Sequence, residues 1–138
     1  MKPKRLILII LPVLLLLGGG AAYRFVSSSK PSAPPEQTCH LDLPDLTLNL
    51  ADEDRPHYLK TGVSLVIVGA APEETLLERE SQTRDAVIMV ITQHTYRELL
   101  SPKGKEALKS NIQTAVNAVL CEDGFEVRDV LFTEFIMD

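Results

Sequence analysis

The sequence contains few of the residue patterns on which enzymes and nucleic-acid-binding proteins depend. Only four of its seven glycines follow residue 20, and they lie too far apart for a phosphate-binding loop: Gly62, Gly69, Gly104 and Gly124. No serine or cysteine has a histidine at a spacing typical of a nucleophilic active site. Three of the 14 basic residues precede residue 6, so 11 remain against all 19 acidic residues, and this net charge of −8 disfavours binding to nucleic-acid phosphates. The sequence therefore predicts a protein that is not an enzyme and that binds neither nucleic acid nor a small-molecule substrate.

Cysteine and histidine are scarce as well. Neither Cys39 nor Cys121 belongs to a CxxC pair or has a histidine at zinc-finger spacing. In an oxidising compartment they could pair and close a loop of about 80 residues, worth roughly 4 kcal/mol; two unpaired thiols are the alternative. The three histidines are His40, His57 and His94. Nothing in their spacing predicts that they converge, and the acidic run 52–54 lacks the glycine and later glutamate of a calcium loop. We therefore expect no metal and no cofactor, and a solvated turn at residues 52–54.

One long apolar run is present. Residues 6–23 carry no charge and follow three basic residues, Lys2, Lys4 and Arg5. Eighteen helical residues span about 27 Å, and the segment reaches the ~30 Å hydrocarbon core of a bilayer if Phe25 and Val26 join it. The pattern predicts a transmembrane helix over residues 6–26, which also tethers the protein to the membrane. The basic flank predicts a cytoplasmic N-terminus, residues 1–5, with the remainder on the other side.

A cleaved signal peptide is the alternative interpretation of this segment. It has a basic start, an apolar stretch over residues 6–17 and a small-residue site at Gly20-Ala21-Ala22. The two interpretations predict different mature N-termini. An anchored protein begins at Met1, whereas a released periplasmic binding module begins at Tyr23.

Residues 27–37 have the composition of a linker, with four serines, three prolines and no large apolar side chain. The remaining residues, 38–138, are enough for one small domain with one core. We expect this domain to lie on the side of the membrane opposite residues 1–5, held away from it by the linker.

Period-two alternation predicts three strands in this domain. Residues 46–50 alternate, and Pro44 before them suggests an edge strand. The run from Tyr58 to Val68 is expected to form a hairpin with it, and its end is expected to be covered on both faces because Val66 and Val68 oppose the main apolar set. The last strand, 127–137, has apolar residues on both faces, which suggests a central position.

Two helical regions lie between the second and third strands. Helical pattern runs from Pro72 to about Leu100 with a break near residues 81–83, and its segment 86–91 is apolar all round, which predicts packing on more than one side. A second helix begins with Ser101 as N-cap and Pro102 at the first position. Its apolar stripe is the clearest in the chain: Leu108, Ile112, Ala115, Val116, Val119 and Leu120. Gly124 is a candidate C-cap of this helix. The three strands and two helical regions give the element order β-β-α-α-β, and the fold class is therefore α+β.

Five segments of the sequence together carry a family resemblance. They are Leu48-Asn49-Leu50-Ala51-Asp52, Tyr58-Leu59-Lys60, Arg84-Asp85-Ala86-Val87-Ile88, 99–109 and 127–137. In this order and spacing, after one membrane segment, they resemble the FliL family of flagellar basal body-associated membrane proteins. The resemblance covers residues 46–138, and the chain has Asp138 where the family often has glutamine.

The resemblance implies a single-pass protein of the bacterial inner membrane whose periplasmic domain is similar to stomatin-type (SPFH) domains. It implies a non-enzymatic role at the flagellar basal body, beside MotA/MotB-type stator units, in support of flagellar rotation, motility and chemotaxis. The domain is expected to associate with itself into a ring around the stator through its helices and a sheet edge. Residues 27–37 would then lie near the stator, and the family has no catalytic residues to transfer.

Overall fold

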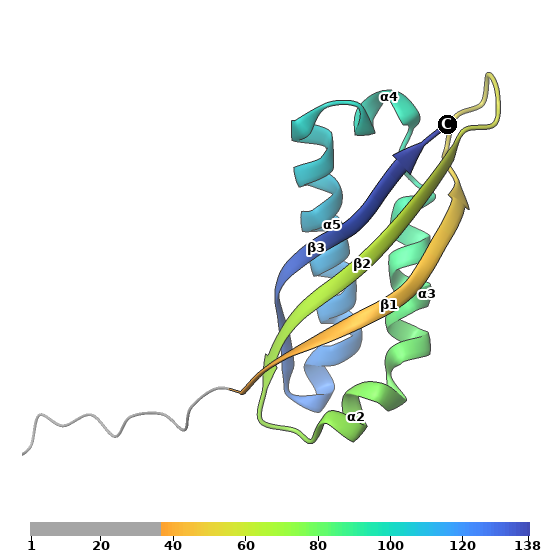
Figure 1. Ribbon diagram of the computed structural model, residues 1–138. Coiled ribbons are helices and arrows are strands. Elements are labelled where there is room, and N and C mark those ends of the chain that lie inside the picture. Colours follow the sequence, from red (N-terminus) through yellow and green to blue (C-terminus); the bar gives the residue numbers. More distant parts are fainter. Residues whose placement is uncertain (1–36) are drawn as a thin grey trace, which may run out of the picture. The chain divides into compact units, whose positions relative to one another are not determined.

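The protein is described here by a computed structural model of residues 37–138. The predicted segments 1–5 and 6–26 lie outside the described residues, and the predicted linker meets them only at Gln37. The strands are β1 (Gln37–Asn49), β2 (Tyr58–Gly69) and β3 (Phe125–Met137). The helices are α2 (Glu73–Glu78), α3 (Glu80–Ile91), α4 (Tyr96–Leu99), α5 (Pro102–Leu120) and the 3₁₀ turn η1 (Cys121–Asp123). The strands form one antiparallel sheet with the helices packed against one of its faces, which confirms the α+β class (Figure 1). Within residues 37–138 no helix is both long and apolar enough to cross a membrane.

The first strand is longer than the alternation predicted. β1 begins at Gln37, nine residues before the predicted start, and Leu41 and Leu43 are buried in the core. The register against β2 shifts between Leu43 and Leu46, where Pro44 and Asp45 form a bulge opposite Gly62. The bulge breaks the period-two pattern, and this hid the first half of the strand. The edge position suggested by Pro44 is confirmed, since β1 pairs only with β2.

The prediction that the last strand is central is wrong. The order is β1-β2-β3, so β2 lies in the middle and β3 forms the second edge. Two of the apolar side chains that suggested a central position, Leu131 and Ile136, are 37% and 53% exposed on the face away from the helices. The apolar side chains of β2 that face the helices are buried instead: Leu59, Leu65 and Ile67 are inaccessible to solvent. Helices α3 and α5 cover this side (Figure 1). On the other face Val68 is buried and Val66 half-buried, so the expected burial of both faces at the end of β2 is met at Val68 and only in part at Val66.

The first helical region is divided into three short helices. The predicted break near residues 81–83 lies at Arg79, between α2 and α3, and a second interruption at residues 92–95 separates α3 from α4. The segment 86–91 is not buried all round, because Val87 and Ile91 are inaccessible but Met89 is 55% exposed. Helix α4 begins with a capping box in which the Thr95 side chain and the Glu98 carboxylate bond each other's main-chain amides.

Helix α5 follows the sequence prediction closely. Ser101 is its N-cap, bonded to the Gly104 amide at 3.0 Å, and Pro102 opens the helix. The predicted stripe packs on the sheet, with Leu108, Ile112, Val116 and Leu120 inaccessible to solvent. Helix α5 itself ends at Leu120 with Cys121 as its C-cap, so the predicted cap at Gly124 is displaced: Gly124, with φ 78°, ends the η1 turn that follows. The core of the domain is therefore one layer between α3, α5 and the sheet.

Candidate interaction surfaces

The structure brings together three side chains that sequence spacing did not connect. His57 lies 5% exposed in the loop between β1 and β2, and its ring approaches the carboxylates of Asp52 and Asp54, with one ligand-type atom from each residue within 4.8 Å of the others. His40 is exposed on β1, and His94 follows α3 and contacts Asn111 and Glu98. The three histidines thus occupy separate places. Only the fold of the hairpin loop could have revealed the cluster around His57.

Both ring nitrogens of His57 and one oxygen of Asp52 are already engaged in hydrogen bonds. The Arg55 Nε donates to His57 Nε2 at 3.1 Å, so Nδ1 carries the proton and donates to the Asp138 main-chain oxygen at 3.2 Å. The His57 ring also stacks on Tyr96, with centroids 4.3 Å apart. Asp52 accepts the Tyr96 amide at 2.7 Å. The arrangement fastens the hairpin loop to α4 and to the end of β3, and a cation would have to displace Arg55 to reach the ring.

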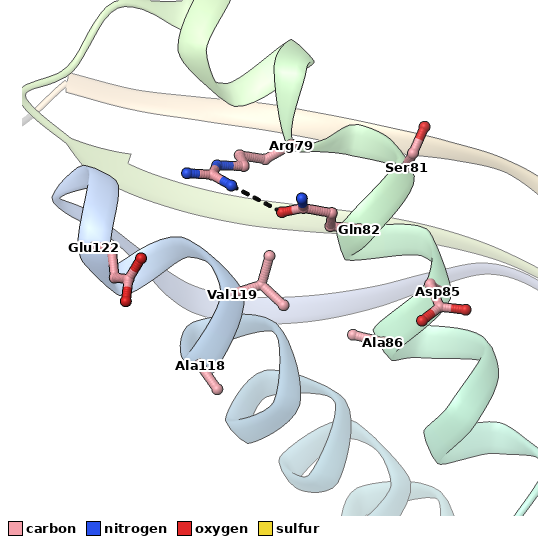
Figure 2. Close-up of a pocket in the computed structure, with 8 residues that line it drawn as sticks. All are labelled: Arg79, Ser81, Gln82, Asp85, Ala86, Ala118, Val119 and Glu122. Atoms are coloured by element: carbon pink, nitrogen blue, oxygen red, sulfur yellow. Dashed lines mark hydrogen bonds between the residues drawn. The ribbon is translucent and has the colours of Figure 1, made fainter.

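A shallow hollow of about 590 Å³ lies between α3 and α5 on the outer side of the helical layer. Figure 2 shows its small apolar side chains, Ala86, Ala118 and Val119, below a polar rim. At one end Arg79 donates to Asp123 at 2.6 Å and to Gln82 at 3.0 Å, and this ion pair raises the pKa of the guanidinium. The hollow is open and has charges of both signs on its rim. It is suited to contact with a protein surface rather than to enclosing a small molecule.

Two pairs of neighbouring charged residues on the helices, Arg84-Asp85 and Arg97-Glu98, have different surroundings. Arg84 is exposed and Asp85 lies on the rim of the hollow. Glu98 belongs to the capping box of α4, where the Thr95 amide at 3.0 Å lowers the pKa of its carboxyl. Arg97 is exposed. Arg84 and Asp85 are therefore available to a partner at the helical face near the hollow.

The outer edge of β3 is blocked in one half and open in the other. We call residues 125–132 the lower half of β3. There the Asn117 side chain accepts a hydrogen bond from the Val127 amide at 2.7 Å, and the Gln113 side chain donates to the Val127 and Arg128 carbonyls. A bulge at Thr133, opposite Gly62, separates this part from residues 134–137, which we call the upper β3 edge. Within residues 37–138 no side chain is recorded on the outward main-chain groups of the upper β3 edge. This segment therefore has unsatisfied strand-pairing capacity.

A row of polar side chains on helix α5 lies beside this edge, with lysines at its start and amides further along. Its members are spaced by four residues: Lys105, Lys109, Gln113 and Asn117. The two amides cap the lower half, whereas Lys105 Nζ lies 5.1 Å from the Phe135 ring centroid and Lys109 Nζ 5.8 Å from that of Phe132. Lysine has no acceptor atom, so it cannot satisfy main-chain N–H groups. The upper β3 edge is thus flanked by positive charge and left unpaired.

The opposite edge of the sheet, β1, is divided in the same way. The bulge at Pro44 and Asp45 separates residues 37–43 from residues 46–49, which we call the upper β1 edge. Proline removes a donor from the ladder at that point. Beyond Asn49 the chain enters the hairpin loop, where Glu53 and Asp54 are exposed. The upper β1 edge therefore carries negative charge at its end.

The two cysteines are unpaired in the structure. Cys39 is half-buried on β1, with its Sγ 3.6 Å from the Ile67 carbonyl, and Cys121 is exposed in η1. Burial raises the pKa of the Cys39 thiol, and the nearby Glu73 carboxylate raises it further. Cys39 is therefore protonated and little reactive at neutral pH.

Comparison with known proteins places these surfaces in a family context. The sequence profile of the family described as "Flagellar basal body-associated protein FliL" matches residues 40–137, nearly the whole of the described domain. The "Flagellar protein FliL" of Aquifex aeolicus (strain VF5) is 34% identical to this chain over 106 residues. These residues make up 76% of the chain and 65% of that relative, so the chain spans just under two thirds of the relative's length.

Proposed function

Since the chain belongs to the FliL family of flagellar basal body-associated proteins, we propose that it is a non-enzymatic component of the flagellar basal body. In this role it supports flagellar rotation and motility. The observation that carries the proposal is the family match, which begins in β1 and ends in β3 and so includes every element of the domain.

The proposed topology is a single pass through the inner membrane. Residues 6–26 form the anchor, residues 1–5 lie in the cytoplasm, and the domain lies in the periplasm beyond the linker 27–37. The uncharged run and its basic flank support this arrangement. Anchoring confines the domain to a plane, which raises its effective concentration there and lets weak contacts act.

The proposed partners are the stator units of the motor (MotA/MotB type) and further copies of this chain, arranged in a ring around the stator. Two features of the domain support an interaction role. The upper edges of β1 and β3 retain main-chain pairing capacity, and the hollow between α3 and α5 offers an open surface of mixed charge. A repeated contact between unlike surfaces closes into a ring only when its rotation divides a full turn.

Deletion of the gene followed by complementation tests the role. We expect the deletion strain to swim or swarm poorly while its filaments still assemble, and the full chain to restore motility. The matched control replaces residues 1–26 with a cleavable signal peptide, so that the same domain is released into the periplasm. Restoration by the released domain would contradict the anchored arrangement, and unimpaired motility in the deletion strain would contradict the proposal as a whole.

N-terminal sequencing of the mature protein separates the anchor from the alternative of a soluble periplasmic binding module. A chain beginning at Met1 supports the anchor, and one beginning at Tyr23 supports release after the Gly20-Ala21-Ala22 site. Partner identity is tested with Ser32→Cys in a chain that also carries Cys39→Ser and Cys121→Ser, so that the linker holds its one cysteine; membranes are cross-linked and the captured protein is identified by mass spectrometry. We expect a stator protein, and capture of copies of this chain alone would contradict stator contact through the linker.

A further inference from the structure

Both edges of the sheet have open main-chain groups at the same end of the domain. Both β1 and β3 pair antiparallel with β2, so they run parallel to each other and their upper edges lie at the end of the sheet that carries the hairpin loop (Figure 1). The bulges at Asp45 and Thr133 both face Gly62, and they divide the two edges at the same level. A Cβ at Gly62 would collide with the Thr133 hydroxyl, so glycine permits both strands to bulge there.

Charge is distributed unequally between these two edges. Beside the upper β3 edge lies Lys105 at the start of α5, with its Nζ over the Phe135 ring. Beyond the upper β1 edge lie the exposed carboxylates of Glu53 and Asp54. Since residues 38–138 are acidic overall, copies repel one another unless a basic surface meets an acidic one. The upper β3 edge is the part of the sheet rim where positive charge and open main-chain groups coincide.

From this geometry we propose that the upper β3 edge of one copy pairs with the upper β1 edge of the next, so that the sheet continues from copy to copy, with Lys105 facing Glu53 and Asp54 of the neighbour. The inference rests on the self-association named under the proposed function and specifies its surface. A neighbour in the same orientation places its β1 parallel to β3, with both upper ends together. The main-chain carbonyl groups of the neighbour's β1 then accept hydrogen bonds from the main-chain N–H groups of the upper β3 edge, which a lysine side chain cannot do.

The symmetric alternative is disfavoured by the same charges. A twofold axis through the upper β3 edge would pair β3 with its own copy, antiparallel and centred near Phe135. Lys105, which lies over Phe135, would then face Lys105 of the second copy. Like charges opposed across an interface cost affinity, so the contact between unlike edges is favoured. Such a contact is head-to-tail and can propagate beyond two copies.

Disulfide trapping in the membrane tests this pairing directly. Thr47 and Ile136 both pair with Lys60 of β2, so they occupy equivalent levels and the same face of the sheet. The full chain, with Cys39→Ser and Cys121→Ser, receives Thr47→Cys and Ile136→Cys, and membranes are oxidised and examined by non-reducing electrophoresis. We expect a ladder of dimers, trimers and larger species. Neither single-cysteine chain should dimerise alone, but the two should give a dimer when co-expressed.

The matched control moves both cysteines to the level of the blocked half of β3. Thr38 and Glu126 both pair with Val68 of β2, so a chain with Thr38→Cys and Glu126→Cys again has its cysteines at one level and on one face. Gln113 and Asn117 cap the edge beside Glu126, and we expect no ladder. Equal cross-linking in this control would overturn the inference. Dimerisation of the Ile136→Cys chain by itself would overturn it in favour of the symmetric contact.

Charge reversal gives a second, independent readout. We expect Lys105→Glu to slow ladder formation on the order of ten-fold, because it opposes the neighbour's carboxylates, and Glu53→Lys in the same chain to restore it. The control reversal is Glu74→Lys at the opposite end of the domain, which should change nothing. Unchanged trapping in Lys105→Glu would overturn the assigned charge contact. If the native-cysteine chain is oligomeric in membranes but no edge pair cross-links, only this inference fails; if it is monomeric throughout, the proposed self-association fails as well.

Discussion

The two halves of the helical layer differ in how their structure is specified. Helix α5 runs for 19 residues with its own N-cap, an opening proline and a regular apolar stripe. The stretch from Glu73 to Leu99 is of similar apolar content but is divided into three helices, and their ends depend on distant groups. Arg79, between α2 and α3, bonds Asp123, and the first amide of α4 bonds Asp52. A helix encoded by its own sequence can thus lie beside helices whose limits are set by the rest of the fold.

Truncation of the α5 stripe is expected to have the largest effect. Ile112 is inaccessible to solvent, and Ile112→Ala should lower the free energy of unfolding by about 2–5 kcal/mol, because it leaves a cavity between α5 and the sheet. The measurement is denaturant unfolding of the full chain followed by circular dichroism. Met89→Ala, at a 55% exposed position of α3, is the control and should cost much less. Similar losses in both variants would contradict the contrast between the two helices.

The junction between the two regions is tested at Gly104. A Cβ there would collide with the Glu98 main-chain carbonyl, so α4 approaches α5 at a distance that only glycine permits. We expect Gly104→Ala to destabilise the fold by about 1–3 kcal/mol, even though alanine is the better helix former by about 1 kcal/mol. Ser110→Ala, at an exposed position of the same helix, is the control and should be neutral or slightly stabilising. A higher free energy of unfolding for Gly104→Ala would show that α4 can move away from α5 at little cost.

A substitution in α3 is expected to act in the opposite direction. The Thr83 hydroxyl is buried and has no hydrogen-bond partner, which is unfavourable by about 1–3 kcal/mol for a polar group removed from water. Thr83→Val keeps the shape and removes the hydroxyl, and we expect the midpoint of thermal unfolding to rise. Thr83→Ser, which keeps the hydroxyl and loses a methyl group, is the control and should lower it. A lower midpoint for Thr83→Val would mean that the hydroxyl has a stabilising partner.

The smallest effect concerns the start of α4. The pKa of Glu98 is below its ordinary value of 4.5 because the carboxylate accepts the Thr95 amide, so the cap is present above that value and is lost as the pH falls through the lowered pKa. We expect amide exchange of Thr95 to accelerate over this acidic range in the native chain. In Glu98→Gln, which keeps an acceptor and does not titrate, the rate should show no such transition. A parallel acceleration in both chains would assign the change to another group.

Local signals in the sequence predicted the parts of the fold that local interactions specify. The N-cap Ser101, Pro102 and the stripe through Leu120 placed α5, and alternation from Tyr58 placed β2. The early part of β1 was missed because the bulge at Pro44 reverses the alternation there. The position of β3 was misjudged, because exposed apolar residues such as Ile136 cannot be distinguished by sequence from buried ones.

The interaction surfaces depended on tertiary placement in the same way. The cluster around His57 joins the hairpin loop, α4 and the end of β3, which are far apart in the sequence. The blocked lower half of β3 depends on Asn117 and Gln113 reaching the strand from α5. No spacing rule connects these residues, since the packing of α5 beside β3 brings them into reach.

The sequence by itself determined the class of the domain, its long helix, its central hairpin and its likeness to a flagellar family, because caps, periodicity and ordered motifs act over short separations. Only the tertiary structure decided which strand is central, where the first helices end and which parts of the sheet rim stay open. These properties arise from main-chain groups and side chains that meet across the fold, and their pairing is settled by packing rather than by neighbours along the chain.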